Sequence, residues 1–321
     1  MNAMPPTLLI AILIVNLVTA QENPGLETSE VEKQLKANVV VLADDIGERN
    51  LTKFKALNQS ADWIEKNLKE FGYQVSRQKF KVRNLDCHNI IAEKKGISQP
   101  KKIIIVGAHY DSVEGTPGAN DNGSGTACLM VLADRFKKLK TDYTLRFVAF
   151  TNEEPPYFQQ EDQMGSWVYA RKCRKDNDNI VGVISLETMG YFSNAPNSQN
   201  YPPPISSEYP TTGNFIGFVS DTKSGVFARK CFKAFKSHSM VPAEIACLPG
   251  TIPGVGWSDH WSFWQEGFAG LMITDTAPFR YPHYHKATDT PDKIDYATLA
   301  KVVLGLEAVI KEISSSADKD K

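Results

Sequence analysis

The sequence predicts an α/β fold, a three-layer sandwich in which a buried, largely parallel sheet lies between helices. Two observations lead to this prediction. Five segments are continuously apolar, as strands covered on both faces are, and stretches with helical periodicity separate them. The apolar segments are residues 102–108, 143–150, 181–186, 215–219 and 269–273.

Further elements are predicted before and between these strands. Helical periodicity covers residues 27–42 and 60–71, and Gly72 stands where helices commonly end. Residues 74–82 and 88–93 alternate between apolar and polar side chains, as half-exposed strands do. The remaining helical segments are residues 123–138, 165–173, 226–238 and 296–313.

The composition is that of a globular protein. The chain has 321 residues, 42% of them hydrophobic, and a formal net charge of −1. This balance excludes a broad basic surface, so nucleic acid is not expected as a partner. The Pro-rich residues 195–210 are predicted to be a long surface loop. Residues 21–321 are therefore predicted to form a single domain, with residues 314–321 as a disordered tail.

The N-terminal residues are predicted to be a signal peptide. Residues 7–18 form an apolar run that is too short to span a bilayer comfortably. Val18, Thr19 and Ala20 precede polar residues, which predicts cleavage after Ala20. An uncleaved anchor and a buried N-terminal segment are the alternatives. The mature protein is expected to be secreted or periplasmic, without stable insertion into a membrane.

The cysteines do not form the pattern of a disulfide scaffold or of a structural zinc site. There are five of them, without any C-x-x-C pair, and the odd number leaves at least one free thiol. Cys231 and Cys247 are candidates for a bridge in an oxidising compartment, and their spacing alone does not decide whether it forms.

Chemically active side chains follow four of the five apolar segments. In an open α/β sheet, ligands bind beyond the carboxyl ends of the strands, so these positions are expected to meet at one edge. A further acid, Asp121, lies in a glycine-rich loop that precedes a helix. The side chains after the strands are His109, Asp111, Glu153, Glu154, Glu187, His283 and His285.

This set of side chains is typical of a metal site. Imidazoles and carboxylates without thiolates suit zinc, or another divalent metal of similar character, in a catalytic site. Two metal ions would need a bridging carboxylate with a ligand set on either side. Because the adjacent Glu153 and Glu154 point in different directions, one can bind metal while the other acts as general base.

Six short motifs follow one another from about residue 85 to about residue 310. They are His109-x-Asp111-Ser112, Gly118-Ala-Asn-Asp121-Asn-Gly-x-Gly, Asn152-Glu153-Glu154, Leu186-Glu187-x-x-Gly-Tyr, Ser258-Asp259-His260, and Tyr284-His285 with Asp289-Thr290-x-Asp292-x-Ile-Asp295. In their order and spacing, these motifs resemble the M28 family of zinc aminopeptidases. The resemblance implies a phosphorylase/hydrolase-like fold with a mixed, mostly parallel sheet. It also implies a centre of two zinc ions that hydrolyses peptides from their free N-terminus.

The resemblance assigns a role to each metal ligand. Asp121 would bridge both zinc ions. His109 and Glu187 would complete one zinc site, and Glu154 and His285 would complete the other. Many relatives carry Asp at the position of Glu187, so this ligand is one methylene longer here.

Roles beyond the ligands are implied in the same way. Glu153 would take a proton from the nucleophilic water and return it to the leaving amine. Asp111 would accept the second N–H of the histidine in the first zinc site. Tyr284 matches a position that in some relatives donates a hydrogen bond to the tetrahedral oxyanion. The peptide bond between Asp121 and Asn122 is expected to be cis.

Three other functions are compatible with parts of the pattern. A glutaminyl-peptide cyclotransferase, which uses a single zinc, shares the His-x-Asp-Ser and Glu-Glu elements. A carboxypeptidase could use the same metal centre, and a non-catalytic ectodomain could keep the fold. The intact Asn-Asp-Asn-Gly-Ser-Gly loop and the downstream Asp-Thr string favour the aminopeptidase. Its expected partners are peptides with a free N-terminus, and the sequence carries no signal for an oligomeric state.

Several assignments stay open at this point. His283 is two residues from His285 and is the alternative ligand. Asp259 and His260 either cap a short helix or line the substrate pocket, and Trp257 belongs either to the core or to that pocket.

Overall fold

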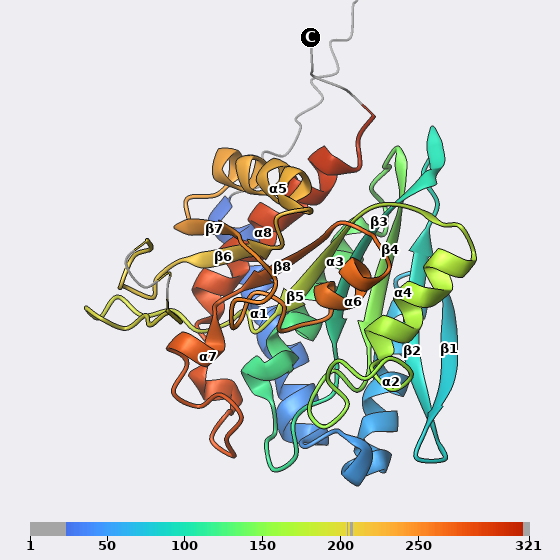
Figure 1. Cartoon of the computed structure of the whole chain (residues 1–321), viewed down its shortest axis with the longest axis horizontal. Helices are drawn as coiled ribbons and strands as arrows, with labels where there is room; N and C mark the ends of the chain where they lie inside the picture. Colours follow the sequence, from blue (N-terminus) through green and yellow to red (C-terminus); the bar gives the residue numbers. More distant parts are fainter. Residues whose placement is uncertain (1–23, 204, 206–207, 317–321) are drawn as a thin grey trace, which may run out of the picture.

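The computed structural model describes residues 24–203, 205 and 208–316. These residues form one eight-stranded sheet with helices packed on it (Figure 1). The strand order is β1-β2-β4-β3-β5-β8-β6-β7. The strands are β1 (Gln74–Val82), β2 (Leu85–Lys94), β3 (Gln99–His109), β4 (Tyr143–Phe150), β5 (Asn179–Glu187), β6 (Ile216–Ser220), β7 (Ala243–Cys247) and β8 (Gly270–Thr274).

The centre of the sheet is parallel and its margins are not. Strands β4, β3, β5 and β8 run in one direction, whereas β2 is antiparallel to β4 and β6 is antiparallel to β8. These four strands match four of the five continuous apolar segments, because helices cover both of their faces; the fifth segment, residues 215–219, is the antiparallel strand β6. The predicted three-layer α/β fold with a mixed, mostly parallel sheet is confirmed.

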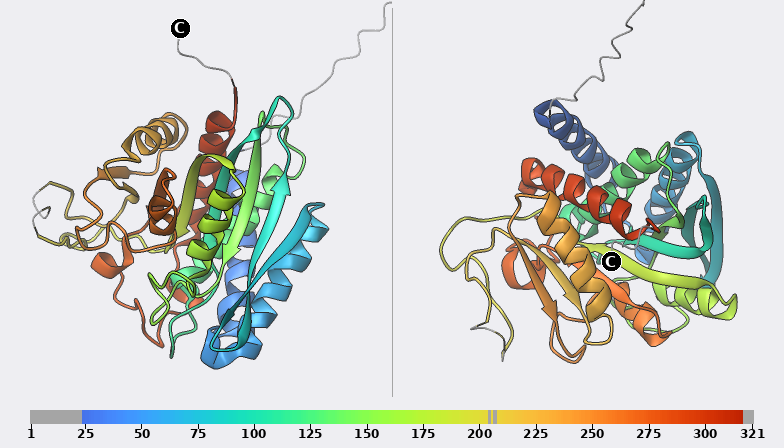
Figure 2. Two further views of the ribbon diagram at one scale, coloured as in Figure 1. Left: turned by 45° about the vertical axis from the view of Figure 1, so that its right-hand side comes forward. Right: turned by 90° about the horizontal axis from the view of Figure 1, so that it is seen from above.

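The helices form two unequal layers (Figure 2). Helices α1, α2, α3, α5 and α8 pack on one face over the larger core, and α4 and α6 pack on the other over a smaller one. The helices are α1 (Pro24–Val40), α2 (Phe54–Glu70), α3 (Gly125–Phe136), α4 (Gly165–Lys175), α5 (Gly225–His238), α6 (His260–Gln265), α7 (Ala277–Arg280) and α8 (Tyr296–Ile313).

Helix α8 has the bounds that the sequence predicts. Asp295 caps it by accepting a hydrogen bond from the backbone N–H of Thr298 at 3.0 Å, which satisfies one of the free donors of the first turn. Its apolar stripe, which includes Leu299, Val303 and Leu306, is buried in the larger core. Each such side chain contributes about 1.5–3 kcal/mol through its burial.

Some elements differ from the prediction. Helix α2 begins at Phe54 rather than at residue 60, and its first turns bury Leu57 against the core. Strand β7 was not predicted, because four of its five residues are only half-buried and it lies at the edge of the sheet. All five cysteines, which lie within the described residues, are free thiols, so Cys231 and Cys247 are not bridged.

The two ends of the chain extend beyond the described residues. The predicted signal peptide, residues 1–20, lies outside them. Of the tail predicted to be disordered, residues 314–316 are described, and Ser314 and Ser316 hydrogen-bond to the segment at Asp142 and Tyr143. None of the helices in the described part of the chain is long and apolar enough to cross a bilayer.

Candidate metal centre

The central strands deliver the predicted site residues to one edge of the sheet. Strand β3 ends at His109 and β5 ends at Glu187, while Glu153 and Glu154 directly follow β4. His285 lies in the chain after β8, beyond helix α7. Because these strands are parallel, their carboxyl ends bring the side chains together, as predicted.

Asp121 lies between two groups of donor atoms. Its Oδ1 is 3.5 Å from Nε2 of His109, and its Oδ2 is 3.1 Å from Nε2 of His285. Nε2 of His109 is also 3.2 Å from Oε2 of Glu187, and Nε2 of His285 is 3.2 Å from Oε2 of Glu154. The five predicted ligands therefore form two triads that share Asp121. The first triad is His109, Asp121 and Glu187, and the second is Asp121, Glu154 and His285.

Asp111 positions the two adjacent glutamates. Its Oδ1 accepts a hydrogen bond from the backbone N–H of Glu153, and its Oδ2 accepts one from that of Glu154, both at 3.2 Å. The same Oδ1 lies 3.5 Å from Nδ1 of His109. Oε2 of Glu153 is 3.8 Å from Nε2 of His109, so Glu153 stands beside the first triad. One carboxylate thus orients both glutamates and lies beside the histidine.

Side chains from distant segments hold the loop that carries Asp121. The peptide bond between Asp121 and Asn122 is cis, as the resemblance implied. Asn122 donates from Nδ2 to the carbonyl of Leu186 at 2.8 Å, and its Oδ1 accepts the N–H of Thr188 at 3.0 Å. These two partners flank Glu187 at the end of β5. Asp289 accepts the N–H of Asp121 at 3.0 Å.

A fully buried arginine, Arg49, lies beneath the same loop. Its Nε donates to the carbonyl of Tyr110 at 2.6 Å, and its Nη2 donates to that of Gly118 at 2.7 Å. Burial lowers the pKa of Arg49 to about 10, against the pull of nearby carboxylates, so the guanidinium stays charged at neutral pH. Arg49 was not predicted, because these two partners are 61 and 69 residues away and no motif includes it. The backbone carbonyls that accept hydrogen bonds from the side chain of Arg49 are those of Leu42, Gly47, Tyr110, Pro117 and Gly118.

Negative charge accumulates in the centre. Burial raises the pKa of Glu153 well above its ordinary value, and the charges of Glu187 and Glu154 raise it further. Burial together with the charge of Asp121 raises the pKa of Glu154 to about 8. Burial alone would lower the pKa of His109, but Glu187 and Glu153 outweigh it and raise that pKa well above 6.5. These directions indicate a site that favours a bound cation.

The geometry distinguishes the two candidate histidines. His285 faces the shared carboxylate, whereas Nδ1 of His283 lies 2.8 Å from Oγ1 of Thr288 in an exposed contact. The ring of Tyr284 stacks on that of His285, with 3.9 Å between the ring centroids. Burial raises the pKa of Tyr284 well above 10, so its hydroxyl stays protonated and can donate a hydrogen bond.

Ser258 holds Glu187 of the first triad by a hydrogen bond. Its hydroxyl donates to Oε2 of Glu187 at 2.7 Å and lies 3.2 Å from the hydroxyl of Ser185 in β5. A carboxylate ligand that is hydrogen-bonded in this way is fixed in one orientation. The Ser-Asp-His motif thus contributes a residue whose role was not predicted.

Asp259, His260 and Trp257 were also considered for the substrate pocket, and only one of them lines it. Asp259 and His260 are fully buried, and neither lines the cavity described below. The side chain of Asp259 does not cap α6, and Nε2 of His260 donates to the carbonyl of Val255 at 2.8 Å. Trp257, in contrast, is 45% exposed and lines the cavity.

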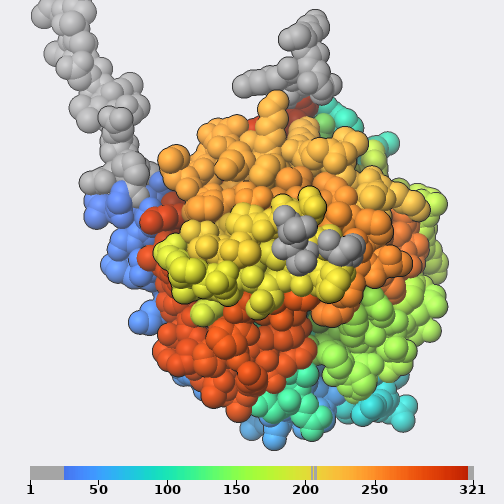
Figure 3. Space-filling model, turned by 60° about the vertical axis from the view of Figure 1, so that its left-hand side comes forward, coloured from blue at the N-terminus to red at the C-terminus, as the bar shows by residue number. Residues whose placement is uncertain are grey.

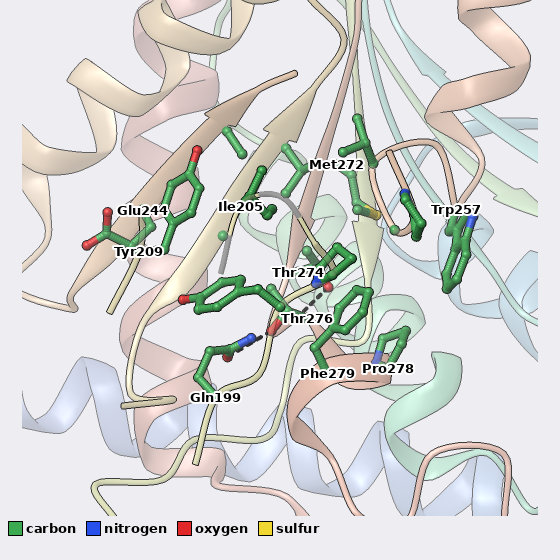
Figure 4. Close-up of a pocket in the computed structure, with 18 of the residues that line it drawn as sticks. Gln199, Ile205, Tyr209, Glu244, Trp257, Met272, Thr274, Thr276, Pro278 and Phe279 are labelled. Atoms are coloured by element: carbon green, nitrogen blue, oxygen red, sulfur yellow. Dashed lines mark hydrogen bonds between the residues drawn. The ribbon is translucent and has the colours of Figure 1, made fainter. Parts of the chain in front are cut away.

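A cavity of about 770 Å³, including the part open to solvent, adjoins the triads (Figure 4). Glu187, one of the predicted ligands, and Tyr284 both line it, and the rest of the lining is predominantly apolar and aromatic. Of the described residues that line it, none is Lys or Arg. We call residues 192–215 the wall segment, and its described residues that line the cavity are Gln199, Tyr201, Pro202, Ile205, Tyr209 and Phe215.

The donor atoms fit a metal ion. Nε2 of His109 is buried and has no hydrogen-bond partner among the described residues, although carboxylates surround it. Single donor atoms of His109, Asp121 and Glu154 all lie within 4.8 Å of one another. Nitrogen and oxygen donors without sulfur suit zinc in a catalytic site.

Comparisons with known proteins agree with this chemistry. The model of the family described as Peptidase family M28 matches residues 89–310. The uncharacterized protein YfbL of Escherichia coli (strain K12) is 35% identical over 85% of this chain and 86% of its own length. A "Probable leucine aminopeptidase" of Trichophyton verrucosum is 26% identical over 77% of this chain and 65% of its own. The zinc aminopeptidase BSAP from Bacillus subtilis is 16% identical, covers 89% of this chain and 96% of its own, and superposes with a TM-score of 0.71.

Proposed function

Because the chain belongs to peptidase family M28, we propose that it is a zinc-dependent aminopeptidase that hydrolyses the N-terminal peptide bond of peptides. Membership confirms the resemblance read from the six motifs and the predicted class of enzyme, a metallo-exopeptidase. The observation that carries the proposal is the position of Asp121, whose two oxygens face separate histidine–glutamate pairs.

Two zinc ions per chain are part of the proposal. His109, Asp121 and Glu187 would hold one, and Asp121, Glu154 and His285 would hold the other. When bound, zinc lowers the pKa of water and polarises the carbonyl that is attacked. The surplus of negative charge and the unpaired Nε2 of His109 support this occupancy.

Glu153 is proposed as the general base. It accepts the proton of the attacking water and passes it to the amine that leaves, which a carboxylate with a raised pKa does efficiently near neutral pH. The two hydrogen bonds of Asp111 to the backbone hold Glu153 and Glu154 apart in their separate roles. The hydroxyl of Tyr284 donates a hydrogen bond to the oxygen of the scissile carbonyl, which becomes negatively charged during the reaction.

The cavity supports an apolar N-terminal residue as the part of the substrate that is recognised. Its apolar walls begin beside Glu187 and Tyr284, so a side chain next to the reacting bond enters them directly. The carboxylate of Glu187, which lines the cavity, would attract the free ammonium group of a peptide. A carboxypeptidase would need a cation for the C-terminal carboxylate, and the described lining contains no Lys or Arg. These observations favour the aminopeptidase over the carboxypeptidase.

Export and domain organisation complete the proposal. The apolar run at residues 7–18 and the small residues before Gln21 predict a signal peptide that is cleaved after Ala20. Residues 21–321 would then be the mature, single-domain enzyme, secreted or periplasmic. Mass spectrometry of the N-terminal peptide of the exported protein tests this, and a chain that starts at Met1 would contradict it.

The first experiment measures zinc per chain and the release of p-nitroaniline from leucine p-nitroanilide in one preparation of the mature protein. Two zinc ions with release that a chelator abolishes would support the proposal. One zinc ion without release, together with cyclisation of a peptide that begins with glutamine, would replace it by the cyclotransferase. A protein that binds no metal would overturn the mechanism.

A further inference from the structure

The wall segment has no helix or strand in its described residues, yet it forms one side of the cavity. In Figure 3 it is the yellow band that crosses the surface between orange residues on either side. A loop of this length needs specific contacts to present a defined wall, because its backbone has few internal hydrogen bonds. Those contacts converge on one buried side chain.

That side chain is Arg280, the last residue of α7, which is 7% exposed. Its Nε donates to Oε1 of Gln199 at 2.6 Å, in the middle of the wall segment. Its Nη1 donates to the carbonyl of Phe215 at 2.8 Å and to that of Tyr191 at 3.3 Å, at the two ends. The guanidinium also lies over the ring of Phe215, 4.4 Å from its centroid. One arginine therefore holds the beginning, the middle and the end of the loop.

Gln199 is the matching residue in the wall segment. It is 4% exposed, and its Oε1 accepts a second hydrogen bond from Oγ1 of Thr276 at 3.0 Å, which Figure 4 shows. The backbone N–H of Asn200 donates to the carbonyl of Phe279 in α7 at 2.9 Å. Gly213 lies so close that a Cβ there would be 2.9 Å from Nε of Arg280. The loop is shaped to receive this arginine.

The same contacts reach toward the metal centre. Asp275 accepts from the backbone N–H of Tyr191 at 2.7 Å and from Nδ2 of Asn120 at 2.8 Å. Asn120 precedes the shared ligand Asp121, and the carbonyl of Tyr191 is one of the acceptors of Arg280. The cavity wall and the metal-binding loop are thus fixed on a common support.

We propose that Arg280 is a positioning residue that sets the width of the cavity, and with it the selectivity for bulky apolar N-terminal side chains. The proposal rests on the aminopeptidase function. Without the guanidinium the wall segment loses its three anchors and moves away from the aromatic and aliphatic groups opposite. A large side chain would then lose contacts, whereas alanine, which scarcely enters the cavity, would lose little.

Arg280→Met tests this with phenylalanine p-nitroanilide and alanine p-nitroanilide as substrates. The ratio of kcat/KM for phenylalanine to that for alanine should fall about tenfold, mainly through KM, while bound zinc is unchanged. Hydrogen–deuterium exchange should rise in peptides that cover residues 192–215. Arg229→Met, which removes an exposed arginine of α5, is the control and should change none of these values.

A matched pair at Gln199 gives a second test if Arg280→Met does not fold. Gln199→Glu keeps the acceptor for Arg280 and should leave hydrogen–deuterium exchange in residues 192–215 unchanged, whereas Gln199→Leu, of similar size, should raise it. An unchanged selectivity ratio in Arg280→Met, or unchanged exchange in Gln199→Leu, would overturn the proposal. Equal loss on both substrates together with loss of zinc would also overturn it, since Arg280 would then only support the metal site. If the wild-type enzyme released neither amino acid, the proposed function would fail, while the exchange experiment would still show whether Arg280 holds the segment.

Discussion

The carboxylate of Asp289 accepts the backbone N–H of Asp121 at 3.0 Å, across 168 residues of sequence. Its other oxygen accepts the N–H of Asn120 at 2.8 Å and the hydroxyl of Tyr281 at 2.7 Å. Three donors therefore meet one carboxylate behind the shared metal ligand. The position of Asp121 therefore depends on a side chain that is not one of the predicted ligands.

Asp289→Asn should weaken metal binding without removing a ligand. An amide has only one acceptor oxygen, so its NH₂ group would face a backbone N–H and displace the loop. We expect zinc affinity to fall about 10–100-fold, and activity to return with excess zinc. Zinc titration with a competing chelator measures this. Asp292→Asn, at an exposed position nearby, is the control, and equal affinities in both variants would contradict the prediction.

Glu153→Gln should separate metal binding from catalysis. The amide cannot accept the proton of water, and the five ligands are untouched, so zinc content should stay while kcat falls about 1,000-fold. Asp121→Ala should instead lose both zinc and activity, because both triads share that carboxylate. Metal analysis and kcat are measured on the same samples. Near wild-type turnover in Glu153→Gln would show that another group is the base.

Arg49→Met should destabilise the whole fold. The change leaves buried carbonyls without a donor, including those of Tyr110 and Gly118, and we expect a loss of about 3 kcal/mol or more in the free energy of unfolding. Urea denaturation of the metal-free protein measures it. Arg174→Met removes an exposed arginine of α4 and should cost much less. Similar midpoints for the two variants would show that Arg49 is dispensable.

His260 predicts a pH dependence of stability. Burial lowers its pKa to about 4, whereas in the unfolded chain it stays near 6.5. Between these values the unfolded state binds the extra proton, so this contribution is complete above pH 6.5 and is lost as the pH falls toward 4. Its size is up to about 3 kcal/mol.

His260→Gln isolates this contribution from other titrating groups. The glutamine can still donate to the carbonyl of Val255, the partner of Nε2 in the native ring, but it does not titrate. Denaturation at pH 7 and at pH 5 should therefore show a smaller loss of stability for the variant than for the wild type. The same loss in both proteins would assign the pH dependence elsewhere.

The pattern of apolar residues predicted the helices and strands well where an element is buried along its whole length. Helix α8 and the central strands carry long apolar repeats, so their predicted and observed bounds agree closely. Strand β7 has only five residues and a half-covered face, and its periodicity is too weak to separate it from loop. The start of α2 was placed six residues late, because the polar residues Asn58, Gln59 and Ser60 separate its apolar first turn from the rest of the pattern.

The site divides in the same way. The proposed metal ligands could be read from the sequence, because four of them follow a buried strand, Asp121 lies in a glycine-rich loop, and the chemistry of each is visible in the residue type. Arg49 and Arg280 were not, because what matters about them is contact with backbone carbonyls from distant segments. Any arginine in the chain would look the same in the sequence. Only the tertiary arrangement distinguishes these two from arginines on the surface.

The wall segment and the proposed catalytic residues occupy separate parts of the chain. All five proposed ligands and the proposed base lie outside residues 192–215, in or beyond the central strands. The loop enters and leaves the fold at Tyr191 and Phe215, whose carbonyls meet the same guanidinium. Foreign loops could therefore be grafted between these two points, provided that they keep an acceptor for Arg280. New substrate preferences could then arise, in the laboratory or in evolution, without any change to the chemistry of bond cleavage.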